Sequence, residues 1–415
     1  MPVPEPSTVE SAAASGVFIG VDWGNAHHQL CVLDATGGVL EQSKVAHNVA
    51  GLRELTGRLR RHGPVAGVAI ERSEGLLVET LQQHGHRLFC VSPKMSARAR
   101  ERYRLAPAKS DAFDAFVLAD SLRHQHWHWR PLAVPSPLLA ELRALTRDRE
   151  RLIWNQRDVE NQLRAIVQVY HPVVLGLFSS LDRDITLAFL RDYPTPAHAG
   201  RVGPARMAAF CARHGYSGRT RPELLVERLR TNLLSASTGT TAGKAFSAML
   251  FVDQLELLNA QVRAISKRIR QRLAEHPDAA IFLSFPGMGE ITAATMLAEM
   301  GEDRARFPTA DVLLAETGTA PVTRSSGRSR TVRFRYAANK RMRHAIDWWT
   351  FVSVRDNDWA HDAYQQARAR GQLHNRALRG LGARWTRILW RCWTDHTTYD
   401  PDRHLNNPSA AAISA

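Results

Sequence analysis

The chain has 415 residues, and 44% of them are hydrophobic, which is enough for folded cores and excludes a disordered protein. This length predicts two or three domains. Lys and Arg number 55 against 40 Asp and Glu, which gives a formal net charge of +15 and a pI of about 10.4. Such an excess of positive charge attracts a polyanionic partner, and nucleic acid is the commonest one. A soluble protein that is merely rich in surface arginine is the plainer alternative.

The chain carries little that points to export or to a membrane. Its four cysteines, at positions 31, 90, 211 and 392, are too scattered for a zinc site or a disulfide framework. No run of about 18 apolar residues is present, and the N-terminus lacks the basic and then apolar pattern of a signal peptide. We therefore expect a cytoplasmic protein with no membrane segment, and a loose tail over residues 1–15.

An α/β domain is predicted over residues 16–130. The expected elements are strands at 17–22, 30–33 and 40–45, a helix at about 50–62, a strand at 65–70, a second helix and a strand at 88–91. Gly37-Gly38 suits the turn between the second and third strands. A three-stranded meander followed by alternating helix and strand is the element order of the RNase H-like (RuvC-like) fold.

Four acidic residues occur where this domain can bring them together. Asp22 and Glu71 each end an apolar strand, while Asp111 and Asp114 lie three residues apart at the start of a predicted helix. Four close carboxylates repel one another unless a cation neutralises them, and their hard oxygen atoms select Mg²⁺ or Mn²⁺. Two such ions can stabilise the attacking and leaving oxygens of a phosphoryl displacement. Taken one at a time, these acids are more typical of solvated strand ends and of a polar helix face than of a metal site.

A basic stretch precedes this helix and contains a single acid, Glu101. Its Lys and Arg residues suit contacts to a nucleic-acid backbone beside the metal ions. Those predicted to make such contacts are Lys94, Arg98, Arg102 and Lys109.

Val21-Asp22-Trp23-Gly24 also resembles the first phosphate loop of actin-like sugar kinases, which share this sheet topology. A kinase needs a second glycine-rich loop for adenosine and has no use for the acids at 111 and 114. No such loop is found, so the kinase hypothesis is set aside.

The middle of the chain, over residues 131–278, is predicted to hold two long helices with a linker between them. Apolar residues recur at alternating steps of four and three from Leu138 to Ile166, interrupted by Arg149 and Gln156, and again from Phe251 to Ile269. The two seams are compatible with pairing within one chain, between chains, or both, and with an ordinary helical bundle. Pro and Gly punctuate residues 172–245, which predicts a flexible connection.

A mainly α-helical domain is predicted over residues 279–395, followed by a tail at 396–415. Near its start, Phe285-Pro286-Gly287-Met288-Gly289-Glu290 resembles a helix-hairpin-helix turn. The backbone N–H groups of Gly287 and Gly289 would then hold a DNA phosphate at the next helix N-terminus. A plain turn between packed helices is an equal alternative.

An arginine-rich, serine-containing segment follows. From Arg324 to Arg343 there are eight Lys or Arg residues and no acid. A serine beside a glycine in such a loop suits attack on a phosphodiester, because nearby guanidinium groups stabilise the developing negative charge. A basic nucleic-acid-binding loop with incidental serines is the alternative. The residues expected to contact nucleic acid are Arg324, Arg328, Arg330, Lys340 and Arg341.

In their order and spacing these features resemble the insertion-sequence-110 family of transposases, which combine an N-terminal DEDD domain with a C-terminal serine domain. The resemblance covers nearly the whole chain. The matching segments are Gly20-Val21-Asp22, Glu71, Lys109-Ser110-Asp111 with Asp114-Ala115, Pro286-Gly287-Met288-Gly289 with Thr292-Ala293, Ala320-Pro321, Ser326-Gly327, Asn339-Lys340-Arg341 and Arg370-Gly371.

The resemblance implies a bacterial recombinase guided by RNA. Asp22, Glu71, Asp111 and Asp114 match the family's metal-binding acids, and Ser326 matches its nucleophile, which forms a phosphoserine link to DNA. The implied partners are target and donor DNA, a structured non-coding guide (bridge) RNA, and further copies of the chain in dimers and tetramers with composite active sites. The implied location is the cytoplasm, on the nucleoid during the reaction.

This chain departs from the family pattern in three places. Gly318-Thr319 replaces a usual Gly-Leu, and the stretch from Arg333 to Ala338 contains fewer glycines than is typical. Ser325 directly precedes Ser326, so the nucleophile assignment can shift by one residue. Two other functions are compatible with the residues alone: a Holliday-junction-type nuclease that uses carboxylates and water, and a nucleic-acid-binding protein without catalysis.

Overall fold

A computed structural model describes residues 16–103, 110–231, 234–327 and 329–402. It divides into two compact units, with the boundary after Val134. The predicted tail at 1–15, the greater part of that at 396–415, and the predicted contacts Lys109 and Arg328 lie outside the described residues. Within these ranges no helix is both long and apolar enough to cross a membrane.

The N-terminal unit is built on a mixed five-stranded sheet, as the sequence predicts. The strands are β1 (Val17–Asp22), β2 (His27–Leu33), β3 (Val39–Ala46), β4 (Val65–Ile70) and β5 (Leu88–Cys90). Their order in the sheet is β3-β2-β1-β4-β5. Strands β1, β2 and β3 form the antiparallel meander, while β4 pairs parallel to β1 and β5 pairs parallel to β4. This topology fits the RNase H-like fold.

Four helices cover the two faces of this sheet. They are α1 (Val49–Arg61), α2 (Leu76–Gln83), α3 (Pro93–Arg100) and α4 (Asp111–Gln125). Side chains of α1 and α2 pack with Ile19 and Val21 on one face, whereas Leu118 and Leu122 of α4 pack with Phe18 on the other. Asn and Ser N-caps fix where helices begin, because their side chains accept a hydrogen bond from a first-turn N–H.

Gly20 sets how closely α4 approaches β1. A Cβ atom at this position would lie 1.9 Å from the carbonyl oxygen of Ala115 and 2.5 Å from the nitrogen of Ala119. Both helix residues are small and fully buried. The backbones of β1 and α4 are therefore in direct contact, and only glycine permits that contact.

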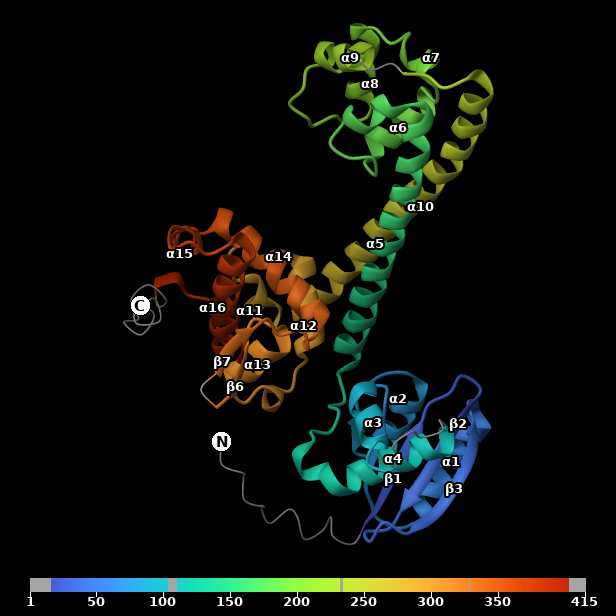
Figure 1. The fold of residues 1–415 in the computed structure, drawn as a ribbon, viewed down its shortest axis with the longest axis vertical. Helices are drawn as coiled ribbons and strands as arrows, with labels where there is room; N and C mark the ends of the chain where they lie inside the picture. The colour runs from blue at the N-terminus through green and yellow to red at the C-terminus, as the bar shows by residue number, and fades with distance from the viewer. Residues whose placement is uncertain (1–15, 104–109, 232–233, 328, 403–415) are drawn as a thin grey trace. The chain divides into compact units, whose positions relative to one another are not determined.

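The second unit is organised by two long helices that pack side by side, α5 (Pro137–Tyr170) and α10 (Thr238–Ala274) (Figure 1). Leu139 and Leu142, at the start of α5, share a core with Ile269 and Leu273 at the end of α10. The end of α5 shares another core with the first half of α10. The pair is thus antiparallel, and it forms within one chain, one of the arrangements that the sequence left open.

Polar residues lie inside the contact between α5 and α10. Arg149 and Gln156, which interrupt the predicted seam of α5, donate hydrogen bonds to Ser266 (2.8 Å) and Asn259 (2.5 Å) of α10. The seam of α10 differs in part from the predicted one. Its buried residues follow a seven-residue repeat that includes these two polar partners: Ala245, Ala248, Val252, Leu255, Asn259, Ser266, Ile269 and Leu273. An apolar pattern alone cannot detect them.

Residues 172–231 fold as a small helical layer around their own core rather than as a plain connection. Its helices are α6 (Asp184–Asp192), α7 (Pro196–Ala199), α8 (Pro204–Arg213) and α9 (Pro222–Thr231). Phe189 and Phe210 are buried there, with ring centroids 5.6 Å apart. Three of these helices carry proline in the first turn, where no N–H donor is required, so the prolines that suggested a linker start helices instead.

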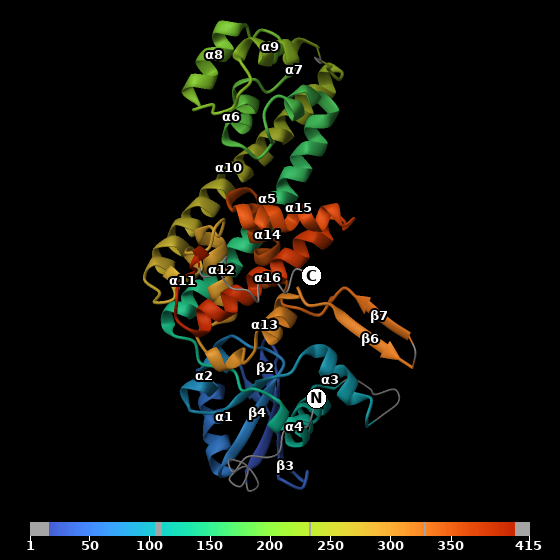
Figure 2. The same ribbon diagram turned by 90° about the vertical axis from the view of Figure 1, so that its left-hand side faces the viewer.

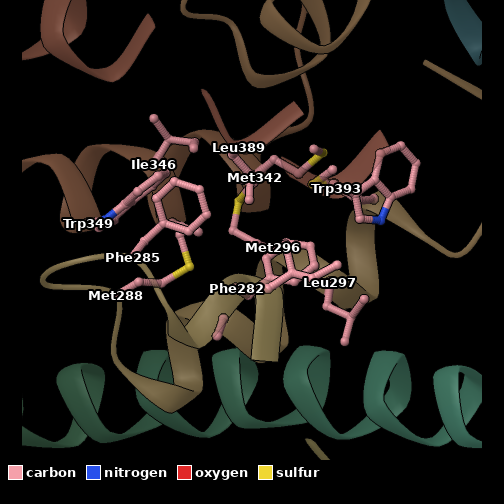
Figure 3. Close-up of a cluster of buried hydrophobic side chains, with 14 of the residues drawn as sticks. Phe282, Phe285, Met288, Met296, Leu297, Met342, Ile346, Trp349, Leu389 and Trp393 are labelled. Carbon is pink, nitrogen blue, oxygen red and sulfur yellow. The ribbon is translucent and has the colours of Figure 1, made fainter. Parts of the chain in front are cut away.

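The C-terminal half of this unit is mainly helical, as predicted. Its elements are α11 (Ala279–Leu283), α12 (Glu290–Met300), α13 (Ala310–Thr317), β6 (Val322–Ser326), β7 (Ser329–Arg333), α14 (Lys340–Asp356), α15 (Asp358–Ala369) and α16 (His374–Thr394). Figure 3 shows Phe285, Met296, Ile346 and Trp349 among the side chains of its core. The indole N–H of Trp349 donates to the carbonyl oxygen of Pro286 (3.0 Å), so this core holds the predicted DNA-binding turn against α14.

Gly20→Ala is expected to destabilise the N-terminal unit by roughly 2–3 kcal/mol, because the new methyl group must separate α4 from β1. Equilibrium urea unfolding followed by circular dichroism measures this change. Gly57→Ala is the matched control: a Cβ there meets nothing within 4 Å in the middle of α1, so stability should rise by roughly 0.5–1 kcal/mol. Equal stability of Gly20→Ala and wild type would show that the contact is not tight.

Candidate active site

Asp22 and Glu71 lie at the ends of adjacent parallel strands. The residues before them, Val21 and Ile70, are register partners of β1 and β4. Side chains alternate between the faces of a sheet, and Gly20 on β1 lies against α4. Asp22, two residues further on, therefore belongs to the face that α4 covers. Glu71 belongs to the same face, since Ala69 packs there with Leu118 of α4.

The first turn of α4 lies at the same edge of the sheet. Along β1, Phe18 packs with Leu118 and Leu122, and Gly20 contacts Ala115 and Ala119, so the helix runs against the strand direction. Continuing two residues along β1 from Gly20, and one turn toward the N-terminus of α4, brings the end of β1 toward the residues that begin α4. These include Asp111, which is exposed, and Asp114, which is buried. Ser110 caps this turn, its hydroxyl accepting a hydrogen bond from the Phe113 N–H (3.3 Å).

The residues that follow the two strand-end acids contact each other. The Arg72 guanidinium lies 3.6 Å from the centroid of the Trp23 ring, a cation–π contact between the loop after β1 and the loop after β4. This contact joins the two loops that carry Asp22 and Glu71. It was not anticipated from the sequence, because nothing in a one-dimensional pattern pairs residues 23 and 72.

Asp114 is paired with a cation that the protein itself provides. Its Oδ1 accepts a hydrogen bond from Nη1 of Arg100 at 2.7 Å, and its side chain is only 5% exposed. Among the described residues, no group of three or more His, Cys, Asp or Glu side chains stands in a metal-holding arrangement. The backbone thus brings the four acids to one edge of the sheet, while their side chains do not surround a common point.

The predicted nucleic-acid contacts on α3 face outward. Lys94 and Arg98 are exposed on this helix, and Arg102 is exposed just beyond its end. Arg98 and Arg102 also border a cavity of about 230 Å³ with Met95 and Trp129. In contrast Arg100, which the sequence does not distinguish from its basic neighbours, turns inward to Asp114.

Ser326 lies at the end of a two-stranded ribbon, β6–β7, which is drawn in orange in Figure 2. All residues of both strands are exposed except Val322, which is half-buried. Ser326 pairs with Ser329 across the ribbon, and Ser325 pairs with Arg330. Adjacent residues of a strand point to opposite faces, so Ser326 shares its face with Arg324 while Ser325 shares its face with Arg330. The exposed Gly327 begins the turn with φ +54°.

Both ends of the segment that carries the ribbon are tied to buried groups. On the leading side, the hydroxyls of Thr317 and Thr319 lie 2.9 Å apart and both are buried. On the trailing side, Asn339 caps α14 by accepting hydrogen bonds from the Arg341 and Met342 N–H groups. Its side-chain amide donates to Oε2 of Glu299 at 2.8 Å. The ribbon is therefore exposed along its length but fixed at its base.

Glu299 is the buried anchor of this arrangement. It lies on α12 with 5% of its surface exposed, and Nε of Arg147 donates to its Oε1 at 2.9 Å. Burial by itself raises the pKa of Glu299, but hydrogen bonds and charge from Arg147, together with Asn339 and the charge of Arg341, outweigh burial and hold the pKa below its usual value. The carboxylate therefore stays ionised and joins α5, α12 and the start of α14.

The remaining predicted nucleic-acid contacts differ in how accessible they are. Arg324, Arg330 and Lys340 are exposed. Arg341 instead forms an ion pair with Glu150 of α5, with Nε and Oε2 2.8 Å apart. This ion pair gives Arg341 a structural role that is independent of any contact with nucleic acid.

The Pro-Gly turn contains one packed and one open glycine. Gly287 has φ +73°, and a Cβ there would lie 2.9 Å from the backbone nitrogen of Ser353, so packing against α14 explains this glycine. Gly289 is exposed and is the N-cap residue of α12, and no side chain caps that helix. Of the two predicted phosphate contacts, only Gly289 therefore lies at an exposed helix N-terminus, whereas Gly287 is packed.

Comparison with known proteins assigns the chain to a family. A DEDD model for IS110 elements, described as a transposase, matches residues 19–172, and a model described as the transposase IS116/IS110/IS902 family matches residues 279–365. The chain is 35% identical over 400 residues to the mini-circle putative transposase for IS117 of Streptomyces coelicolor, covering 93% of this chain and 96% of that protein. The chain belongs to the IS110 family of transposases. It is therefore an enzyme that cleaves and rejoins DNA, and its DEDD domain indicates the use of a divalent metal ion.

Two further relatives also span nearly the whole transposase. The uncharacterized 42 kDa protein of insertion element IS900 from Mycobacterium paratuberculosis is 30% identical over 404 residues, or 94% of this chain and 98% of that protein. The uncharacterized 44.8 kDa protein of insertion element IS116 from Streptomyces clavuligerus is 29% identical over 392 residues, with 93% and 96% covered. The similarity therefore includes the middle helices as well as the two regions that the family models match.

Glu299→Gln is expected to lower the free energy of unfolding of the second unit by roughly 3 kcal/mol at pH 7, because Arg147 would lose its buried counter-charge. Tryptophan fluorescence during urea unfolding measures this, since six of the ten tryptophans lie between 348 and 393. The lowered pKa means that the stabilisation is complete above the unfolded-state pKa of about 4.3 and is lost as pH falls through the folded-state pKa. The difference in free energy of unfolding between Glu299→Gln and wild type should therefore shrink as the pH is lowered.

The control for this prediction is Glu290→Gln. Glu290 also lies on α12 and pairs with Arg270 at 3.0 Å, but its side chain is 54% exposed. An exposed pair contributes about 0–1 kcal/mol, so this variant should stay close to wild type. Equal losses in the two variants would contradict a special role for the buried carboxylate.

Proposed function

We propose that this transposase is an RNA-guided DNA recombinase that acts through Ser326 and through Mg²⁺ or Mn²⁺ held by Asp22, Glu71, Asp111 and Asp114. The observation that carries the proposal is the register of β1 and β4, which sets Asp22 beside Glu71 on the sheet face covered by α4. That edge also contains the first turn of α4, with its two acids.

The donor set fits a hard divalent cation, because all four side chains offer carboxylate oxygens. The ion pair between Arg100 and Asp114 supports the same conclusion: this edge of the sheet already requires a positive charge to neutralise a buried acid. When bound, the metal would stabilise negative charge on the attacking and leaving oxygens of a phosphodiester. Asp114 must exchange Arg100 for the metal or share its carboxylate between the two.

The exposed ribbon suits a nucleophile. In the proposed reaction the Ser326 Oγ forms a bond to phosphorus while the P–O bond to the leaving strand breaks. The serine proton is lost to solvent, and the leaving oxygen takes up a proton to become a strand-end hydroxyl. A hydroxyl of the second DNA attacks the phosphoserine in turn, restoring the serine and joining the strands. Arg324, on the same face of the ribbon as Ser326, would stabilise charge on the phosphate.

The proposed partners are target DNA, donor DNA, a structured non-coding guide RNA and further copies of the chain. The net charge of +15 supports binding of several polyanions, and the resemblance to the serine transposases supports a guide RNA and composite sites within dimers or tetramers. Residues 16–130 would supply the carboxylates and residues 279–395 the serine. The reaction would take place in the bacterial cytoplasm, on the nucleoid.

Ser326→Ala is expected to abolish a protein–DNA adduct that survives denaturation. The assay combines purified protein, RNA transcribed from the flank of the element and DNA carrying the element's end, followed by denaturing electrophoresis. Ser329→Ala is the matched control, since Ser329 is the cross-strand partner on the same face and should leave the adduct intact. Ser325→Ala should also retain it.

The same assay separates the alternatives. Loss of the adduct only in Ser325→Ala would move the nucleophile to the opposite face of the ribbon. If both serine variants keep the adduct and the rejoined product, the serine mechanism is wrong, and cleavage by water at the carboxylates alone becomes the better account.

Asp22→Asn is expected to slow DNA cleavage by at least ~2–3 decades while leaving DNA binding within a few fold of wild type. Cleavage should also require added Mg²⁺ or Mn²⁺ and stop with a chelator. Glu79→Gln is the matched control, because it removes one exposed carboxylate from α2 in the same unit. Wild-type cleavage by Asp22→Asn would refute the metal proposal. If Asp22→Asn and Glu71→Gln both leave the DNA products unchanged while DNA binding persists, a binding role without catalysis becomes the better account.

A further inference from the structure

An arginine-lined pocket lies at the base of the serine ribbon and has no part in the site described above. Its volume is about 710 Å³. Its walls come from the end of α13 with the residues after it, from β7 with the residues after it, and from α16. Five arginines line it: Arg333, Arg335, Arg376, Arg379 and Arg387. The only acid among the lining residues is Asp311, whose side chain is 85% exposed and 3.8 Å from Arg387.

The floor of the pocket is a trough along one face of α16. Arg376, Gly380, Ala383 and Arg387 follow one another at helical steps of four, three and four, so they share a face. The two small residues lie between the two arginines. A Cβ at Gly380 would meet nothing within 4 Å, so packing within the protein does not require glycine there. Its lack of a side chain leaves room in the trough for a ligand.

An aromatic residue stiffens the wall that joins the pocket to the ribbon. Two guanidinium groups contact the Phe334 ring: that of Arg343 lies 4.7 Å from the ring centroid and that of Arg379 lies 4.4 Å from it. The Tyr336 ring packs edge-on against it, with centroids 4.9 Å apart, and is 81% exposed. Arg335 donates through Nε to the carbonyl oxygen of Ala320 at 3.2 Å. The wall is thus held in place without using the cations of Arg376 and Arg387.

The pocket shares Arg333 with the ribbon face that carries Ser326. Arg333 lines the pocket and pairs with Val322 at the base of the ribbon, while Ser326 pairs with Ser329 at its tip. Both cross-strand pairs point to one face, because they are four residues apart along β6. Four residues of strand span roughly 13 Å, the rise of about four nucleotides of duplex DNA. A DNA strand that reaches Ser326 along this face therefore leads into the trough.

We propose that this pocket binds the phosphodiester backbone of the DNA strand that is cut at Ser326, about four nucleotides from the cut, with Arg376 and Arg387 as phosphate contacts on either side of Gly380. The proposal rests on the proposed function for the choice of DNA and for Ser326 as the position of the cut. The arginines neutralise phosphates without reading bases, so the pocket holds any sequence. It acts as a positioning site for the cut strand.

The test measures binding of labelled 30-base-pair DNA, and of RNA duplex of the same sequence, to the full chain by fluorescence anisotropy at several salt concentrations. Arg376→Ala/Arg387→Ala removes the two phosphate contacts, and Gly380→Leu fills the trough without changing charge while favouring the helix. Arg379 is left intact, because it packs on Phe334. The matched control, Arg151→Ala/Arg355→Ala, removes two arginines whose side chains are 74% and 78% exposed and that lie outside the pocket.

Both pocket variants are expected to bind DNA about 10-fold more weakly, and the double arginine variant should lower the slope of log affinity against log salt by about 2. The control should bind as wild type does, and because the assay measures binding without cleavage, a failure of the serine mechanism would not affect this result. Wild-type DNA binding by Gly380→Leu, equal losses in the control, or losses confined to RNA would each overturn the proposal. Thermal unfolding of every variant confirms that the fold is retained.

Discussion

The direct backbone contact between β1 and α4 is the constraint on which the proposed catalytic part of the N-terminal unit depends. Gly20 removes the one side chain that would separate the strand from the helix, and the small residues Ala115 and Ala119 complete the contact. The end of β1 and the start of α4, which carry three of the acids, lie at one edge of the sheet because these elements touch without side chains between them. A carboxylate site built this way is positioned by backbone geometry, which is stiffer than any arrangement of long side chains.

In the second unit, a buried charged residue rather than a close backbone contact holds the elements together. Glu299 is the only acid between Ile291 and Met300, an otherwise apolar stretch, and it gathers Arg147 from one helix and Asn339 from the base of the ribbon. Burying a carboxylate is unfavourable, so the helix retains it only with partners that satisfy it. The same residue thereby anchors the chain at the point where it returns from the exposed ribbon to the buried core. The two units use different physics, steric in one and electrostatic in the other, to hold their functional segments.

The elements of the sheet could be predicted from the sequence because each strand is a short apolar run and each helix has a recognisable start. Strand β4 was predicted at its observed bounds for this reason. The contacts of Arg100 could not be predicted, since one arginine in a run of basic residues looks like the next until the fold shows which one faces Asp114. Periodicity also missed Asn259 and Ser266, polar residues that are buried because their partners are polar as well. Glu299, an acid directly after the apolar run Met296-Leu297-Ala298, is the available clue to a buried ion pair.

The ribbon that carries Ser326 has only two strands, and nothing within the described residues adds a third to either edge. Hairpins of this size are marginally stable in water, so the hydroxyl is not held in one orientation by its surroundings. The entropy of fixing it is lost only when a ligand covers the ribbon. Under the proposed mechanism, the reactivity of Ser326 therefore depends on the DNA that covers the ribbon, and the free chain holds its hydroxyl in no single reactive orientation.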